Sequence, residues 1–211
     1  MTTYSGSAIA SNLTARSGMV DLITELRLLT ESGTADYSVN AVSYWNDGQL
    51  QTVLDKYRED VIFYELEPYP VTGNGGTAEY YRYEIEEYSN FEKTTGGTAV
   101  FYLQDGTGAT IGTSLYTADY LRGEVVFSSN TQGTSYFVTG RTYDLNAAAA
   151  DVWRKKASHY HTSFNFSTDN HKVDRNQVYQ HCIEMAEQFE SMGAQAVVTM
   201  EVFRSDTDVI E

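Results

Sequence analysis

Three of the four histidines, His159, His161 and His171, lie close together in this sequence, and neutral imidazoles are good zinc ligands. A tetrahedral zinc site needs four ligands, and the chain offers neither a second cysteine nor a well-spaced carboxylate to complete one. His159 and His161 also point to different faces if they belong to one helix. We therefore expect no metal site and no cofactor.

A second group with chemical potential is formed by Glu84, Glu86 and Glu87, which lie in an aromatic run. Paired carboxylates are the catalytic groups of glycosidases. Glu84 and Glu86 share one face of a strand, however, and the sequence identifies no partner for them, so a solvated acidic face is the simpler interpretation. Cys182 falls on an apolar stripe beside His181, which is typical of a buried structural thiol and not of a nucleophile. We expect no catalytic residue.

The charge balance of the chain limits its partners. Fourteen Lys and Arg against twenty-nine Asp and Glu give the 211 residues a net charge of −15, which would repel a phosphate backbone. A like-charged wall is still compatible with a protein that surrounds DNA without gripping it. The single cysteine forms no internal disulfide, and neither a membrane span nor a signal-peptide pattern is present. We expect assembly in a bacterial cytoplasm and no membrane partner.

Apolar residues between positions 19 and 61 recur at helical spacing. The first stripe consists of Met19, Leu22, Ile23, Leu26 and Leu29. Gly33 is placed to end this helix. The second stripe consists of Leu50, Val53, Leu54, Tyr57 and Val61. It follows Asn46 with Gln49 three residues on, the pattern of a capping box, so we predict two amphipathic helices joined by a polar loop.

Between Pro68 and Tyr143 the pattern changes to that of strands. The β-branched or aromatic runs are Tyr80–Tyr88, Ala99–Leu103, Ile111–Leu115, Glu124–Phe127 and Ser135–Thr139. Asp105-Gly106 and Arg122-Gly123 stand where turns are expected, so the spacing predicts an antiparallel sheet or small barrel of hairpins. Many of the seventeen tyrosines crowd this region, an excess that favours an interaction surface.

After Asp144 the helical period returns. Asp144 is a good N-cap for a helix that extends to Tyr160, and its alanines at 147–150 permit close approach of another helix. Asp174 with Gln177 predicts the start of a further helix that ends at Gly193. The apolar stripe of that helix consists of Val178, Cys182, Met185, Ala186, Phe189 and Met192.

Helix pair, strands, helix pair is the order expected when a β unit is inserted into the loop of a helical bundle. We predict an α+β fold, a four-helix core with an inserted antiparallel β domain and extended termini. The predicted organisation is a flexible N-terminal arm (1–18), a helical core domain (19–64 and 144–193), an inserted β domain (65–143) and a C-terminal arm (194–211).

The run from Tyr143 to Trp153 is Tyr-Asp-Leu-Asn-Ala-Ala-Ala-Ala-Asp-Val-Trp, and it is followed by Lys156-Ala157. In this run, where the likeness is strongest, the sequence resembles the head-tail connector, or adaptor, proteins of tailed bacteriophages. The other matching stretches are Phe164-Asn165-Phe166, Gln177 to Phe189, Trp45-Asn46-Asp47, Leu50, and Leu54-Asp55 with Arg58. Together they cover about half of the chain, and the β region is the part least securely matched.

The resemblance implies a structural protein without enzymatic activity, located in the virion neck between capsid and tail. Identical subunits would form a ring, commonly of twelve copies, that docks on the portal protein above a downstream neck or tail-completion protein. It would link the DNA-filled capsid to the tail, with DNA passing through without sequence-specific binding. Two alternatives remain open: an aromatic-rich binding module of a phage tail for carbohydrate or a host surface, and a glycoside hydrolase.

Charge is unevenly placed along the chain, with seven glutamates between positions 65 and 92 and five bases between positions 154 and 175. A ring needs a heterologous contact between two different patches of one subunit. Our hypothesis is that these opposite patches meet across neighbours and fix their register. Its subunit-interface residues are Arg154, Lys155, Lys156, Glu84, Glu86 and Glu87. The alternative is that the three bases complement the C-terminal end of their own helix.

The tail from Ala194 to Glu211 carries an alternating apolar run. Its candidate contact residues are Val198, Met200, Val202 and Phe203. We expect an extended arm that adds β-type contacts on the portal or on an adjoining subunit. Packing against the chain's own sheet is the alternative.

Overall fold

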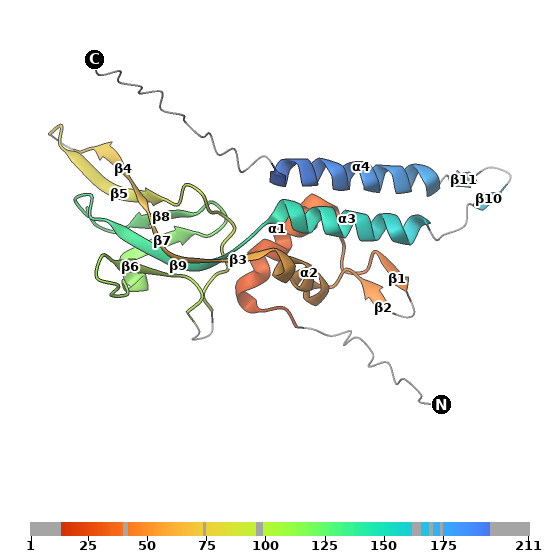
Figure 1. The fold of residues 1–211 in the computed structure, drawn as a ribbon, viewed down its shortest axis with the longest axis horizontal. Helices are drawn as coiled ribbons and strands as arrows, with labels where there is room; N and C mark the ends of the chain where they lie inside the picture. The colour runs from red at the N-terminus through yellow and green to blue at the C-terminus, as the bar shows by residue number, and fades with distance from the viewer. Residues whose placement is uncertain are drawn as a thin grey trace, which may run out of the picture.

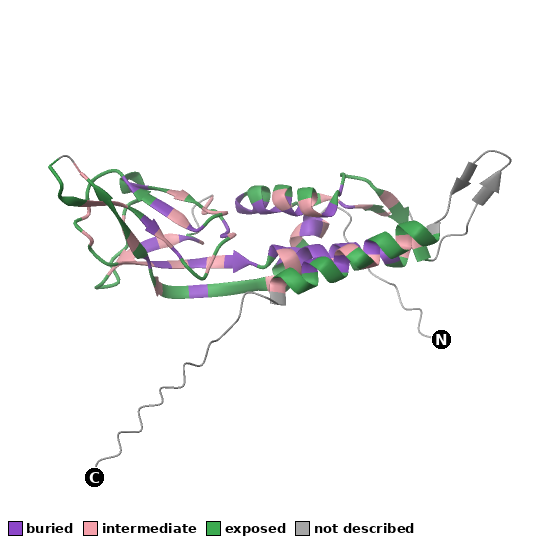
Figure 2. Cartoon of the chain, turned by 90° about the horizontal axis from the view of Figure 1, so that it is seen from above, coloured by how far each residue is buried: buried purple, intermediate pink, exposed green. Residues whose placement is uncertain are grey.

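Two hydrophobic cores lie along the long axis of the molecule. The computed structural model describes residues 14–39, 42–73, 75–95, 99–161, 166–168, 171–173 and 175–194. The helices gather at one end and the two larger sheets at the other (Figure 1). In Figure 2 the buried residues form one group among the helices and another between the sheets, and exposed residues cover the outer strands.

The first core is built by helices from both halves of the sequence. These are α1 (Val20–Thr30), α2 (Asp47–Leu54), α3 (Leu145–His161) and α4 (Arg175–Ala194), with the short 3-10 helices η1 (Ser17–Met19) and η2 (Asp55–Tyr57). Residues from all four helices are buried in one cluster, among them Leu22 of α1, Leu50 of α2, Ala149 of α3 and Ala186 of α4. Segments that are distant in sequence therefore share one core.

The predicted capping box is confirmed at the start of α2. The Asn46 side chain accepts a hydrogen bond from the Gln49 backbone N–H at 3.0 Å, and the Gln49 side chain accepts one from the Asn46 N–H at 3.0 Å. Two helix ends were predicted wrongly. α1 ends at Thr30, where Glu31 takes the left-handed conformation (φ 49°), and not at Gly33. α2 ends at Leu54 and does not reach Val61. Val61 instead belongs to a strand and is buried in the second core.

α3 is the central helix of this part. Its N-cap is confirmed, since Asp144 Oδ1 accepts a hydrogen bond from the Ala147 N–H at 2.9 Å. The buried alanines 148–150 leave room for the other helices, and α4 packs along α3 (Figure 1). The predicted stripe of α4 is buried at Cys182, Ala186 and Phe189, whereas Val178 is 37% exposed.

The second core lies between two antiparallel sheets. The three-stranded sheet has the order β3-β9-β6, and the four-stranded sheet has the order β4-β5-β8-β7. Their strands are β3 (Arg58–Glu65), β4 (Glu67–Thr72), β5 (Ala78–Glu84), β6 (Tyr102–Asp105), β7 (Tyr116–Asp119), β8 (Glu124–Phe127) and β9 (Tyr136–Tyr143). Residues of both sheets share the core, including Leu103, Tyr83, Val125 and Val138. The 3-10 helix η3 (Thr113–Leu115) precedes β7.

β3 and β4 follow each other with only Leu66 between them, and they form the outer edge of the two sheets. β3 pairs with β9, while β4 pairs with β5. The register shifts between Val61 and Tyr64, which leaves Ile62 77% exposed. Both prolines of the chain, Pro68 and Pro70, lie in β4. Edge strands tolerate proline because a nitrogen that faces solvent needs no N–H partner.

The predicted fold class, a four-helix core with an inserted antiparallel β domain and extended termini, is wrong. The structure is richer in sheet than that architecture, although the four helices are present. The loop between α1 and α2 contains the hairpin of β1 (Tyr37–Val39) and β2 (Val42–Tyr44), and β10 (Phe166–Thr168) pairs with β11 (His171–Val173) between α3 and α4. The residues after η2 pair with β9 as strand β3 instead of continuing a helix.

Candidate functional site

The predicted basic residues Arg154 and Lys155 lie on α3 beside Lys56 of η2. Lys56 Nζ is 2.8 Å and Lys155 Nζ is 3.3 Å from the same oxygen of Asp151, and Arg154 pairs with Glu190 of α4. We call Lys56, Arg154 and Lys155 the cationic group. These three cations form ion pairs with only two carboxylates. The side chain of each cation is at least 39% exposed.

The shared Asp151 carboxylate affects the pKa values of both Asp151 and Lys155. Burial alone would raise the pKa of Asp151, but the hydrogen bond from Lys56 and the charge of Lys155 outweigh it and lower that pKa. Burial lowers the pKa of Lys155, and the neighbouring charge of Lys56 adds to that effect. Two ammonium groups thus share the Asp151 carboxylate, and Asp144 lines the same hollow as Arg154 and Glu190.

Lys156 occupies a different environment from its neighbour Lys155. Its side chain is 7% exposed, and its ammonium donates to the Thr30 carbonyl at 2.7 Å at the end of α1. Asp36 completes the site with an oxygen 3.0 Å from Nζ. A lysine is therefore buried here as the cation that complements the C-terminal end of α1. The structure separates Lys156 from the cationic group.

The predicted acidic residues are spread over two surfaces. Glu84 on β5 pairs with Arg82 at 2.6 Å and faces outward from the four-stranded sheet. Glu86 follows that strand, and a hydrogen bond shared with the Glu67 carboxyl raises its pKa. Glu87 lines a cleft between the sheets and the helices. The structure therefore brings Glu84 and Glu86 near Glu67, and both Glu86 and Glu87 line the cleft.

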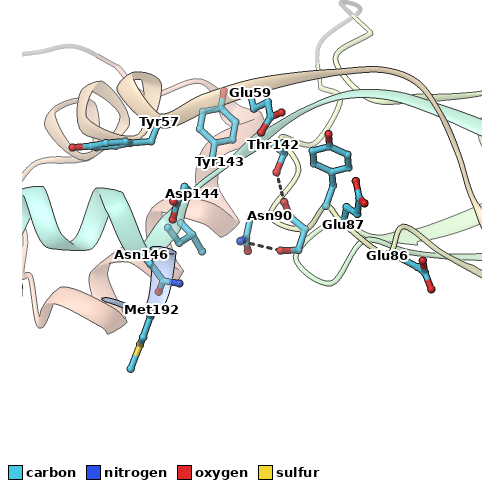
Figure 3. Close-up of a pocket in the computed structure, with 14 residues that line it drawn as sticks. Tyr57, Glu59, Glu86, Glu87, Asn90, Thr142, Tyr143, Asp144, Asn146 and Met192 are labelled. Atoms are coloured by element: carbon cyan, nitrogen blue, oxygen red, sulfur yellow. Dashed lines mark hydrogen bonds between the residues drawn. The ribbon is translucent and has the colours of Figure 1, made fainter. Parts of the chain in front are cut away.

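The cleft has a volume of about 710 Å³ and lies where the β part meets the helices. Figure 3 shows Glu59, Glu86 and Glu87 on the β side, with Asp144 and Met192 on the helical side. Its described lining residues include no lysine, arginine or histidine. Glu86 and Asp144 lie on opposite sides of the cleft in Figure 3.

A buried charge network behind the cleft joins the two cores. Glu92, 3% exposed, accepts a hydrogen bond from Arg16 Nε at 2.8 Å and another from the Tyr143 hydroxyl at 2.7 Å. Arg16 also pairs with Asp55 of η2 at 2.6 Å. The pKa of Arg16 is raised by these carboxylates, and burial together with Glu92 raises that of Tyr143.

A backbone hydrogen bond joins the same two segments, near Arg16 and near Glu92. The Lys93 N–H donates to the Gly18 carbonyl at 3.2 Å, and a Cβ at Gly18 would lie 2.2 Å from the Lys93 carbonyl oxygen. Glycine is required by this close approach. Sequence reasoning missed the network, because Arg16 and Glu92 are 76 residues apart and neither carries a local pattern.

The histidines and the cysteine take part in packing. The His159 ring stacks on Tyr37 of β1 with centroids 3.9 Å apart, and His161 lies against Tyr179. Cys182 is buried, and burial raises the pKa of its thiol. Within the described part of the chain, no group of three or more His, Cys, Asp or Glu could hold a metal ion. The side chain of His171 lies outside the described residues.

Several predictions fall on residues outside the described ranges. These are most of the N-terminal arm, the helix-start residue Asp174, and the tail residues Val198, Met200, Val202 and Phe203. Among the helices that the structure describes, none is long and apolar enough to cross a membrane. No protein-family model matches the sequence, and no curated protein matches it.

Proposed function

We propose that this chain is a structural, non-catalytic subunit of the head-tail connector ring in the neck of a tailed bacteriophage. Identical copies form a ring, commonly of twelve, that docks on the portal protein and meets a downstream neck or tail-completion protein. Packaged DNA passes through the ring without sequence-specific contacts. Assembly takes place in the host cytoplasm.

One observation carries this proposal. Four of the stretches that resemble connector proteins meet in a single core: those near Trp45, near Leu50, between Tyr143 and Ala157 and between Gln177 and Phe189. Trp153, at the end of the strongest run, donates its indole N–H to the Leu29 carbonyl of α1 at 3.2 Å. Stretches that are scattered along the sequence therefore pack against one another in one hydrophobic cluster.

The distribution of charge supports a passage for DNA. The chain carries twenty-nine Asp and Glu against fourteen Lys and Arg, and a net negative charge of this size repels a phosphate backbone. A ring of these subunits would hold DNA by confinement, without the counterion release that marks DNA-binding proteins.

Electron microscopy of the purified chain with the portal protein of its phage tests the function. Rings stacked on the portal are the expected result, and the portal alone and the chain alone are the controls. The same mixture is examined by sedimentation, where a complex larger than either component is expected. If the chain never associates with the portal across protein ratios and salt concentrations, the proposed function is wrong.

A further inference from the structure

Among the residues that the structure describes, no element packs on the outer face of the four-stranded sheet. On its inner face, Tyr83, Val125 and Phe127 are buried in the second core. The opposite face exposes Tyr69 of β4 by 51% and Val126 of β8 by 39%. Exposed aromatic and β-branched residues on one face of a regular sheet are typical of a surface that contacts another protein.

A row of carboxylates crosses this face beside the apolar residues. The strand register places Glu67 opposite Glu84, Glu84 opposite Glu124, and Glu124 opposite Asp119. Like charges directly opposite each other in a sheet are destabilising. Arg82 offsets part of this repulsion by pairing with Glu84 at 2.6 Å and with Glu124 at 2.9 Å. We call these residues, with Tyr69 and Val126, the acidic sheet face.

The chain itself carries a complementary surface on its helical part, near the junction with the sheets. In the cationic group, Lys56 is 51% and Arg154 is 47% exposed, and three cations face two carboxylates. The cationic group lies among the helices, whereas the acidic sheet face belongs to the β part (Figure 1). Two different complementary patches on one subunit are what a heterologous, head-to-tail contact requires.

We infer that the acidic sheet face binds the cationic group of a second copy of this chain. The inference rests on the proposed ring and names the surfaces that join its subunits. Tyr69 and Val126 supply the apolar part of the contact, and the carboxylate row positions the incoming cations. The pairing forms between free copies, so it is measurable without a portal.

Engineered cysteines test the geometry. Val126→Cys marks the acidic sheet face, and Lys56→Cys marks the cationic group; the native Cys182 is buried. When the two variants carry tags of different size, oxidation is expected to produce mainly the mixed disulfide. Wild-type chain treated in the same way is the control. Disulfides that form equally between identical variants would overturn the inference.

Charge reversal tests the chemistry. Glu67→Lys and Lys56→Glu are each expected to weaken self-association at least about tenfold at low salt. A mixture of the two variants is expected to associate, because each reversed patch then meets a complementary one. Glu187→Lys on the exposed side of α4 changes the net charge by the same amount as Glu67→Lys and is expected to associate like wild type. Sedimentation velocity measures all four samples.

Two outcomes contradict the inference: a wild-type chain that stays monomeric at about 1 mM, or a mixture that associates no better than either variant alone. These results are independent of the portal experiment. Rings that form on a portal regardless of both reversals leave the proposed function intact and remove this contact. Copies that pair as described but never engage a portal leave the contact intact and remove the connector function.

Discussion

At the scale of single residues, the most consequential groups are Glu92 and Lys156, both of which are charged and buried. Sequence patterns identified neither role. Lys156 was grouped with its basic neighbours, although its partners Thr30 and Asp36 lie more than a hundred residues earlier. Burial of a charge depends on long-range packing, and the local pattern of a helix does not encode it.

Replacing Glu92 with glutamine tests the junction network. The variant keeps the size of the side chain but leaves Arg16 without its buried partner. We expect the free energy of unfolding to fall by about 2 to 3 kcal/mol, below the roughly 3 to 5 kcal/mol of a fully buried pair because Arg16 is partly exposed and keeps Asp55. Urea unfolding measures the change. Glu87→Gln, an exposed control, is expected to stay within about 0.5 kcal/mol of wild type.

Two adjacent lysines offer a matched comparison. Lys156→Met removes the cation from the end of α1 and leaves Asp36 without its ion-pair partner, so we expect a loss of about 2 to 3 kcal/mol. Lys155→Met is expected to cost below about 1 kcal/mol, because Asp151 keeps its pair with Lys56 in a partly exposed setting. Thermal and urea unfolding measure both variants. Equal losses would contradict the separate environments of these residues.

At the scale of elements, local signals were the dependable ones. The capping box at Asn46 and the N-cap at Asp144 each involve residues three apart, and both were predicted correctly. β8 also matches its predicted bounds, Glu124–Phe127. The predicted strand Ile111–Leu115 is wrong, since its second half forms η3.

β3 and β4, two of the strands that sequence reasoning missed, share a physical cause. β3 begins with three charged residues, and β4 contains two prolines, so neither shows the alternating pattern of a half-buried strand. Both lie at sheet edges, where few side chains need burial. The sequence identified the acidic sheet face only in part. Glu84 lies opposite Glu67 and Glu124 because of the strand register, which the sequence pattern does not show.

The alanines of α3 provide a test of helix packing. Ala149 is fully buried, so Ala149→Leu is expected to lower the free energy of unfolding by about 1 to 3 kcal/mol. Ala147 borders a hollow of about 230 Å³ beside Tyr57 and Arg154. Ala147→Leu therefore has room and is expected to change stability by no more than about 0.5 kcal/mol. Urea unfolding compares the two; a tolerated leucine at 149 would contradict close packing there.

At the scale of the whole molecule, two cores are held together by a small junction. The chain crosses it where η2 leads into β3 and where β9 leads into α3, and the Arg16–Glu92 pair braces it. The order of elements along the sequence correctly indicated that residues from both halves share a helical core. It underestimated the sheets, because edge strands and short hairpins carry weak sequence patterns.

Both tryptophans, Trp45 and Trp153, lie in the first core, so their fluorescence reports on the helical part alone. Hydrogen exchange of peptides from β5 and β8 reports on the second core. Because the junction couples the cores, we expect the two signals to share one midpoint in urea. Separate midpoints would show that the two parts unfold independently and that the junction contributes little.

The long outer edge formed by β3 and β4 has a consequence for how copies meet. Proline lacks the N–H that an incoming strand would use, and charged side chains flank the β3 half, so growth of a continuous sheet from molecule to molecule is discouraged. An edge of this kind protects a protein from fibril formation. Association is thereby directed to side-chain surfaces, whose strength responds to salt, instead of to backbone ladders.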